Sequence, residues 1–256
     1  TFVGRLTKEM EKEVGFNLDI VQAASHDTAS AVVSVPAEEK DFLYISSGTW
    51  SLMGVEREEA DYSEESRIHN FTNEGGYEYR YRYLKNIMGL WMQQSVKKEY
   101  ENKYSYNELW EMAEKSGFGV TIDANDERLL APESMIQTIQ ELCKEKGEKI
   151  PETPGEVVNV IAHSLAECYK KTAEEIEALT GKKYPVLHIV GGGSQADYLC
   201  RLTAKATGKK VLAGPMEGTA VGNLVVQMIR DKSYRNIHEA RKAVGESFEV
   251  KKYLPE

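Results

Sequence analysis

The last third of the chain alternates between short apolar runs and helical patterns. Residues 186–190 form an apolar run of strand length, and a glycine-rich turn, Gly191 to Ser194, follows directly. The pattern then continues as helix, strand and helix over residues 195–207, 211–213 and 218–230. Strands that alternate with helices of this length form βαβ units. The sequence therefore predicts an α/β fold in its C-terminal part.

Three earlier strands are predicted at residues 19–24, 42–46 and 50–55, with a short helix at residues 27–33. Ser47-Gly48-Thr49 separates the second and third of these strands and indicates a hairpin turn. An early three-strand meander followed by βαβα units predicts a mixed β-sheet flanked by helices.

Apolar residues recur at helical spacing elsewhere. Leu84, Ile87, Met88, Trp91, Met92 and Val96 predict an amphipathic helix over residues 83–99. Further helices are predicted at residues 106–115, 132–146, 157–180 and 236–244, and an exposed acidic loop at residues 56–65. Residues 1–16 are predicted to form a short amphipathic helix or an interdomain lead-in. We expect one domain over residues 1–256, divided into a strand meander (19–55), inserted strands and helices (56–150), and a long helix with the βαβα part (154–245).

Composition restricts the classes of partner. The net charge of −9 disfavours nucleic-acid binding through a basic surface. No apolar run reaches the roughly 18–20 residues of a membrane span, and no signal peptide is recognisable, so we expect no membrane contact and a cytoplasmic location. Three cysteines without short spacing favour free thiols in a reducing compartment. Because the chain begins at Thr1 without a methionine, we expect a domain excised from a longer protein.

His26-Asp27-Thr28 follows the first predicted strand and opens an apolar, small-residue run. A strand-to-helix junction is suited to positioning hydroxyls and anions, because the first N–H groups of a helix have no partner within the helix. An aspartate there is more often a plain helix cap. The glycine motifs that come later in the chain favour a functional carboxylate at Asp27.

Two small-residue helix starts lie one βα unit apart. Gly191-Gly192-Gly193-Ser194 lets a ligand approach the backbone closely, but it is not the dinucleotide fingerprint because Asp197 occupies the last glycine position. Residues 217–223, with Gly218 and Gly222, leave room for a flat ring or for close helix packing. Together the two starts suit the walls of an adenine site; a packing role for each glycine remains the alternative.

Two polar positions complete the candidate set. A hairpin turn at Gly48-Thr49 offers backbone N–H groups and one hydroxyl to a terminal phosphate. On the helix predicted over residues 83–99, Asn86 and Gln94 would be about 80° apart, so both could line one groove edge, although solvation is the default.

Five stretches together resemble the C-terminal half of the FGGY family of carbohydrate kinases, and within it the rhamnulokinases. They are residues 24–31, 45–51, 83–94, 190–197 and 217–223. The resemblance implies a ribonuclease H-like, actin-like ATPase fold and transfer of the ATP γ-phosphate, with Mg²⁺, to the primary hydroxyl of L-rhamnulose.

The resemblance also implies a role for each candidate residue. Asp27 would be the catalytic base and a substrate contact, flanked by the substrate-binding residues His26 and Thr28, with Asn86 as a further substrate contact. Nucleotide binding would fall to Thr49, Gln94, Gly191, Gly192, Gly193, Gly218 and Gly222. No residue of this chain is expected to ligate the metal.

Such kinases also have an N-terminal domain of similar size, which carries an acidic residue for Mg²⁺ and part of the sugar pocket. Nothing in this sequence corresponds to it, so we expect that domain as a partner and no kinase activity from this chain alone. The alternatives are another FGGY kinase, for xylulose, fuculose or glycerol, and a non-catalytic nucleotide-binding module of the actin or Hsp70 kind. A Rossmann dehydrogenase is disfavoured by the glycine spacing.

Overall fold

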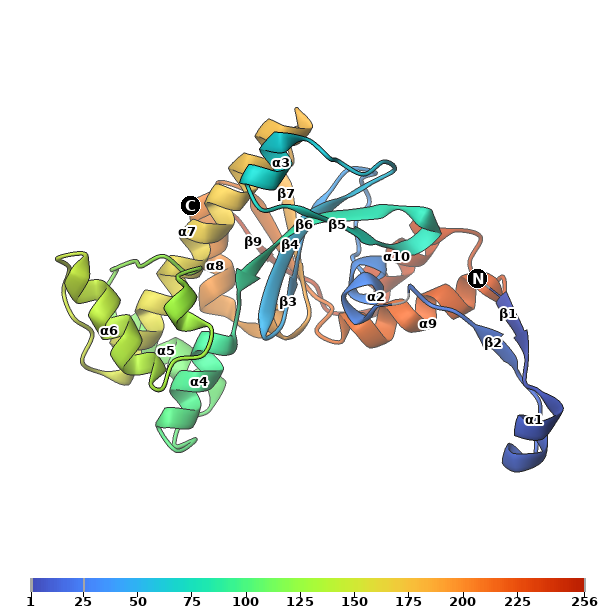
Figure 1. Cartoon of the computed structure of the whole chain (residues 1–256), viewed down its shortest axis with the longest axis horizontal. Helices are drawn as coiled ribbons and strands as arrows, with labels where there is room; N and C mark the ends of the chain where they lie inside the picture. Colours follow the sequence, from blue (N-terminus) through green and yellow to red (C-terminus); the bar gives the residue numbers. More distant parts are fainter. Residues whose placement is uncertain (1, 25, 256) are drawn as a thin grey trace.

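The computed structural model describes residues 2–24 and 26–255. Their main sheet is built from β3 (Leu43–Ser47), β4 (Trp50–Arg57), β5 (Thr72–Gly75), β6 (Tyr81–Met88), β7 (Val186–Val190), β8 (Lys210–Ala213) and β9 (Lys251–Tyr253). The strand order is β5-β6-β4-β3-β7-β8-β9 (Figure 1). β7 runs parallel to its neighbours β3 and β8, and the other neighbouring pairs are antiparallel. The predicted mixed α/β sheet is therefore confirmed.

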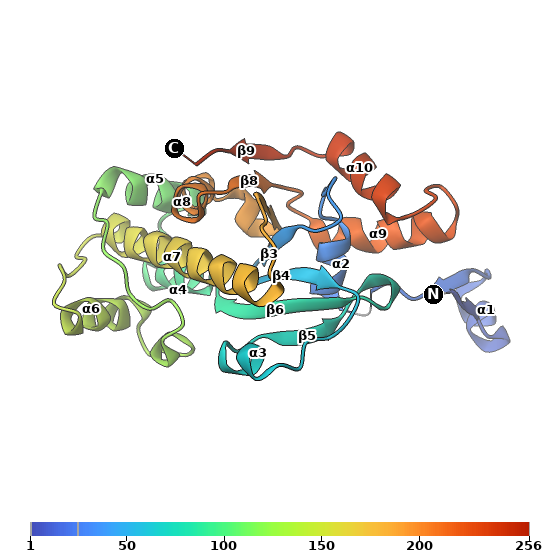
Figure 2. The same ribbon diagram turned by 90° about the horizontal axis from the view of Figure 1, so that it is seen from above.

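Helices cover both faces of this sheet (Figure 2). One face carries α4 (Trp91–Glu99), α5 (Tyr106–Ser116), α6 (Met135–Glu145), α7 (Pro154–Thr180) and α8 (Asp197–Thr207). The other carries α2 (Asp27–Val33), α9 (Gly218–Arg230) and α10 (Ile237–Ser247), and the short α3 (Glu64–Ile68) lies between β4 and β5 in the chain. The helix predicted at 27–33 has the bounds of α2.

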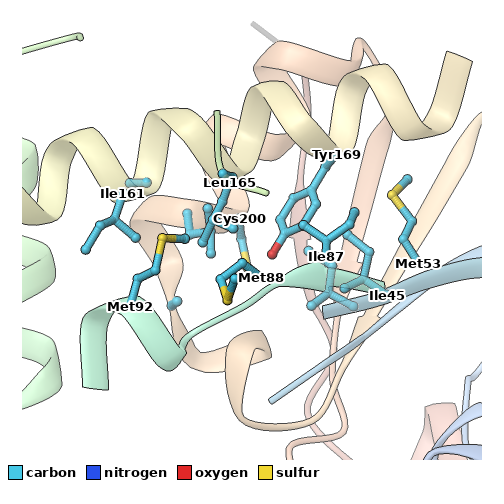
Figure 3. Close-up of a cluster of buried hydrophobic side chains, with 14 of the residues drawn as sticks. Ile45, Met53, Ile87, Met88, Met92, Ile161, Leu165, Tyr169 and Cys200 are labelled. Atoms are coloured by element: carbon cyan, nitrogen blue, oxygen red, sulfur yellow. The ribbon is translucent and has the colours of Figure 1, made fainter. Parts of the chain in front are cut away.

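The larger core lies beneath α7. Ile45, Met53 and Ile87 on three adjacent strands face Leu165 and Tyr169 on the helix (Figure 3). Burying an aliphatic side chain of this size contributes about 1.5–3 kcal/mol relative to leaving it in water. This packing holds β3 and β4, and therefore the hairpin that joins them, against a rigid helix.

Local signals explain why α7 forms where the sequence predicts it. Thr153 caps the N-terminus and Glu156 completes the capping box, with Pro154 in the first turn. Gly181 ends the helix in the left-handed conformation, with φ of 67°. The predicted bounds of this helix are therefore confirmed to within a few residues.

The helix predicted over residues 83–99 is wrong in its first half. Tyr81–Met88 is the strand β6, and α4 begins only at Trp91. β6 lies between β4 and β5, and both faces of its central residues are covered, so its apolar residues do not alternate with polar ones. Gly89 turns the chain where a Cβ would lie 2.5 Å from the backbone carbon of Trp50.

Three other predictions need correction. The strand at 19–24 does not join a meander with β3 and β4: β2 (Asp19–Val21) pairs with β1 (Phe2–Arg5), and with α1 (Lys8–Val14) they stand apart from the body (Figure 1). β1 also interrupts the helix predicted at 1–16. The acidic loop was predicted to begin too early in the chain, at residue 56, because β4 extends to Arg57 and Glu56 is buried against Arg241.

Within the described residues, no helix is long and apolar enough to cross a membrane.

Candidate active site

A cavity of about 640 Å³ opens between the β3–β4 hairpin, the start of α2 and the start of α9. The turn after β7 forms part of its wall through Gly191 and Gly192. β7 runs parallel to β3, so this turn lies beside the end of β3 from which the hairpin leaves. The four sequence elements that we expected to form one site therefore meet at one place.

Asp27 is the first residue of α2, and its side chain is 71% exposed. Oδ1 accepts a hydrogen bond from the backbone N–H of Thr28 at 2.7 Å and lies 2.9 Å from Nδ1 of His26. The backbone carbonyl of Asp27 accepts from the hydroxyl of Thr219 at 3.2 Å. The carboxylate is thus anchored through its own backbone and one oxygen, and it faces the cavity.

Thr28 connects this carboxylate to the interior. Its hydroxyl oxygen accepts from Nη1 of the buried Arg82 at 2.7 Å and lies 2.8 Å from Nδ1 of His26. Since the hydroxyl accepts from Arg82, its own proton is free to be donated to His26. The backbone N–H of Thr28 also reaches Nδ1, at 3.3 Å, so His26 caps the helix.

The glycine turn that follows β7 packs closely against the segments beside it. Gly191 has φ of 88°, a conformation that favours glycine, and its N–H donates to the carbonyl of Pro215 at 3.0 Å. A Cβ on Gly192 would meet no atom within 4 Å, whereas a Cβ on Gly193 would lie 1.9 Å from Oγ of Ser47. Gly192 therefore borders open space and Gly193 permits contact with the hairpin.

Eight of the predicted site residues line this cavity: His26, Asp27, Thr28, Thr49, Asn86, Gly191, Gly192 and Gly218. Asn86 reaches it from β6 and not from a helix, and Gln94, which we expected on the same helix face, lies in α4 away from the lining. Gly193 and Gly222 also lie outside the lining. A Cβ on Gly222 would fall 1.7 Å from the carbonyl oxygen of Ser30, so this glycine lets α9 pack closely on α2.

Several lining residues escaped the sequence analysis. Glu74 lies on β5, and Leu52 lies directly opposite Asn86 on β4. The β5 segment, Thr72–Gly75, has a glycine and no apolar alternation, so nothing local marks it as a strand. The alternating tyrosines from Tyr77 to Tyr83 fit a strand or a recognition surface in the sequence, and the last two of them lie in β6, the partner of β5.

Metal binding requires several ligands around one point. Among the described residues, no three His, Cys, Asp or Glu side chains form such a group. Mg²⁺ at phosphate-transfer sites is typically held by one or two carboxylates together with substrate phosphates and water. The cavity lining includes three acidic residues, Asp27, Glu74 and Glu217, that do not form one ligand cluster, which fits a metal carried mainly by the phosphates.

Comparison with known proteins gives concordant results. Residues 43–230 match the family described as FGGY family of carbohydrate kinases, C-terminal domain. Similar curated proteins include the rhamnulokinases of Halalkalibacterium halodurans, 46% identical over 98% of this chain, and Bacillus subtilis, 44% identical over 92%. The chain covers 54% and 49% of these two proteins, so it spans about half the length of the curated relatives that it matches.

Solved structures share the fold at low identity. A ligand-bound xylulose kinase from Lactobacillus acidophilus aligns with a TM-score of 0.69 at 10% identity, over all of this chain and 51% of that one. A Plasmodium falciparum glycerol kinase with ADP aligns with a TM-score of 0.66 at 12% identity, over 98% of this chain and 49% of that one. At these identities the likeness establishes the fold and leaves the substrate open.

Proposed function

Because this chain belongs to the FGGY family of carbohydrate kinases, we propose that it is the nucleotide-binding and catalytic-base half of an ATP-dependent sugar kinase. The substrate that we propose is L-rhamnulose, phosphorylated at its primary hydroxyl to give L-rhamnulose 1-phosphate. Support for this sugar comes from the rhamnulokinases that match the chain at 39–46% identity. The other part of the site would come from an N-terminal domain of similar size.

One observation carries the proposal: an exposed carboxylate, Asp27, shares a cavity with a glycine turn and a hairpin hydroxyl. A nucleotide-binding module without catalysis has no need of a base at this position. Asp27 would accept the proton of the sugar hydroxyl while the hydroxyl oxygen bonds to the γ-phosphorus and the bond to ADP breaks. Phosphoryl transfer depends mostly on alignment, so the main task of Asp27 would be to orient the hydroxyl.

The remaining lining residues divide by position. Thr49 would meet the ATP phosphates, and Gly191, Gly192 and Gly218 would lie against the nucleotide. His26, Thr28 and Asn86 would contact the sugar. We also propose nucleotide contacts for Gln94, Gly193 and Gly222 on the family resemblance, although they lie outside the cavity. Mg²⁺ would enter with ATP and neutralise charge on the phosphates, with Asp27 nearby.

The decisive variant is Asp27→Asn in the full-length protein that contains this chain. The amide keeps the shape of the carboxylate but cannot accept the proton, so we expect sugar-dependent ADP release to fall by at least about 10³-fold. ATP binding measured by calorimetry should stay within about twofold. Turnover near the wild-type rate would rule out Asp27 as the base.

The sugar is tested with a panel of L-rhamnulose, xylulose, fuculose and glycerol. We expect the highest kcat/KM with L-rhamnulose. A higher value with another member would identify a different FGGY kinase, and phosphorylation of none would leave the non-catalytic nucleotide-binding reading.

Nucleotide binding has its own test. Titration of Mg·ATP into the protein and its Gly192→Val variant should show binding that the variant loses, because the side chain would enter the space beside the turn. Equal affinity in both proteins would mean that the nucleotide does not lie against this turn.

A further inference from the structure

A buried arginine on β6, Arg82, lies behind the cavity and contacts the first turn of α2. Arg82 on β6 is directly opposite Glu74 on β5 and opposite Glu56 on β4. Its side chain is only 2% exposed. A guanidinium removed from water at this depth must be paired and hydrogen-bonded to be tolerated.

The guanidinium of Arg82 donates hydrogen bonds to three acceptors. Nη2 donates to Oε2 of Glu74 at 2.8 Å, Nη1 donates to the hydroxyl of Thr28 at 2.7 Å, and Nε donates to the carbonyl of Gly75 at 3.0 Å. One planar group thus joins β5 to the first turn of α2. The rigid fork of arginine can hold partners in these three directions at once, which a lysine ammonium on a flexible stem does less well.

Glu74 lies between this arginine and the cavity. Its side chain is 32% exposed and lines the cavity with Asp27 and Asn86. Oε2 is held by Arg82, whereas no donor from residues 2–24 or 26–255 reaches Oε1. An ionised carboxylate only accepts hydrogen bonds, and a sugar presents hydroxyl donors on adjacent carbons.

The neighbouring guanidinium decides which ligand suits this carboxylate. The buried positive charge of Arg82 offsets much of the attraction that Glu74 would exert on a metal cation. A neutral hydroxyl meets no such repulsion, and a hydrogen bond to a charged acceptor is about twice as strong as one between neutral groups. Oε1 therefore suits a polyol better than the metal that accompanies ATP.

We propose that Glu74 is a further substrate-binding residue, which accepts a hydrogen bond from a sugar hydroxyl, and that Arg82 is the positioning residue that orients Glu74 and Thr28. This inference rests on the proposed sugar-kinase function. The proposal means that β5 forms one side of the sugar site, although no local sequence signal marks this segment as a strand. It also explains why β6, which has a neighbouring strand on each side, carries a charged residue at a buried position.

The arginine also sets the geometry around the base. α2 has only seven residues, so tertiary contacts determine the direction of its first turn. Arg82 fixes the hydroxyl of Thr28, and Thr28 in turn contacts His26, which flanks Asp27. Arg82 thus acts on the reacting groups through its neighbours and does not itself reach the cavity lining.

The test uses the full-length protein that contains this chain, with Glu74→Gln as the first variant. Gln has nearly the shape of Glu but not its charge, so we expect the KM for L-rhamnulose to rise about 10- to 100-fold and the KM for ATP to stay within twofold. Glu65→Gln, an exposed carboxylate on α3 outside the cavity, is the matched control and should leave both KM values unchanged. A sugar KM within twofold of wild type for Glu74→Gln overturns the proposal, and so does a rise confined to the KM for ATP.

Direct binding separates this proposal from the proposed function. In an Asp27→Asn background, which removes turnover, calorimetry with L-rhamnulose should show a similar loss of affinity on adding Glu74→Gln. If the wild type phosphorylates none of the panel, the kinase assignment fails, and the same titration with each polyol decides the role of Glu74: weaker binding in Glu74→Gln supports it. Equal polyol affinity in both proteins, or no polyol binding by either, overturns it.

Arg82→Lys tests positioning against a purely structural role. The charge remains but the fork is lost, so we expect kcat to fall and the KM for the sugar to rise while the melting temperature changes by only a few degrees. If Arg82→Lys does not fold, the Thr28→Val variant tests the positioning role instead. It removes only the hydroxyl that Arg82 contacts, and we expect it to lower kcat in the same way. Unchanged kcat in a folded Arg82→Lys and in Thr28→Val would overturn the positioning role.

Discussion

Gly192 and Gly193 are neighbours with different physical roles. A side chain at Gly192 would extend into the cavity, whereas a Cβ at Gly193 would lie 1.9 Å from Oγ and 2.5 Å from Cβ of Ser47. Gly193 is therefore required for the turn after β7 to contact the β3–β4 hairpin. The pair shows that a glycine run in a sequence can contain a ligand-facing position and a packing position side by side.

This difference predicts effects of different size for the same substitution at the two positions. Gly193→Ala should lower the free energy of unfolding by about 1–3 kcal/mol, because Ser47 and the backbone must shift to accommodate the methyl group. Gly192→Ala should change it by less than about 0.5 kcal/mol, because the methyl group meets no atom. Urea unfolding of both variants checks this, and equal effects would contradict it.

Some site residues could be predicted from the sequence and others could not. Asp27, Thr49 and Gly192 stand at local features, a helix start and two glycine turns, that are visible in the chain itself. Glu74 and Arg82 have no such local marker. They come together because β5 pairs with β6, which is a contact decided by the sheet.

At the scale of elements, α2 is held at both ends by buried arginines. Arg82 binds Thr28 in its first turn, and Arg241 on α10 donates to the carbonyls of Val32 and Val33 at 3.0 and 3.3 Å. These carbonyls lie at the C-terminal end of the helix, where backbone acceptors have no partner within it. A seven-residue helix thus gains from tertiary contacts the rigidity that its length does not provide.

Arg241 also neutralises Glu56, whose side chain is 5% exposed and lies 2.8 Å from Nη2. Arg241→Met would leave this carboxylate buried without a cation and would remove one hydrogen-bond donor from the carbonyls of Val32 and Val33. We expect a loss of about 3–5 kcal/mol in the free energy of unfolding. The double variant Arg241→Met/Glu56→Gln should lose less than the single variant, and chemical denaturation of both tests this. Additive losses would mean that the two side chains do not interact energetically.

The α2–α9 contact depends on a single small residue. A Cβ on Gly222 would lie 1.7 Å from the carbonyl oxygen of Ser30. Gly222→Ala should therefore separate the two helices and lower the melting temperature by several degrees, corresponding to about 1–3 kcal/mol. Gly245→Ala on the exposed side of α10 is the control, where the added methyl group should stabilise the helix by up to about 1 kcal/mol. A melting temperature unchanged by Gly222→Ala would contradict close packing at this position.

On the scale of the whole molecule, Glu177 joins parts of the chain on both sides of β7. Near the end of α7, its carboxylate pairs with Lys183 at 2.6 Å and with Lys209, which precedes β8. The backbone N–H of Tyr184 donates to it as well, at 3.2 Å. Burial raises the pKa of Glu177, but the hydrogen bonds to these groups outweigh burial and lower the pKa to about 2.

The lowered pKa gives stability a pH dependence of known sign. The stabilisation is fully present above the ordinary glutamate pKa of about 4.5 and is lost as the pH falls towards 2. We expect Glu177→Gln to be less stable than the wild type by about 1–3 kcal/mol near neutral pH. The difference should shrink steadily between about pH 4.5 and pH 2. Unfolding free energies measured across this range check it, and parallel curves for the two proteins would contradict it.

The amino-acid sequence by itself determined the elements whose signals are local. α2, α7, β7 and α9 begin and end where the sequence predicts, within a few residues, because caps, left-handed glycines and apolar periodicity act between residues close in the chain. The order of these elements was sufficient to indicate the mixed sheet and the glycine turn at its edge.

Only the tertiary structure determined the features that depend on contacts between residues far apart in the chain. Residues 81–88 have the apolar spacing of a helix, but they form a strand because β4 and β5 bind both of its edges. The same pairing places Arg82 beside Glu74, and close packing against Ser47 and Ser30 separates Gly193 and Gly222 from the glycines that face the cavity. Hydrogen bonding and burial between segments far apart in the chain override local preference, because each residue gains more from those contacts than from its intrinsic propensity.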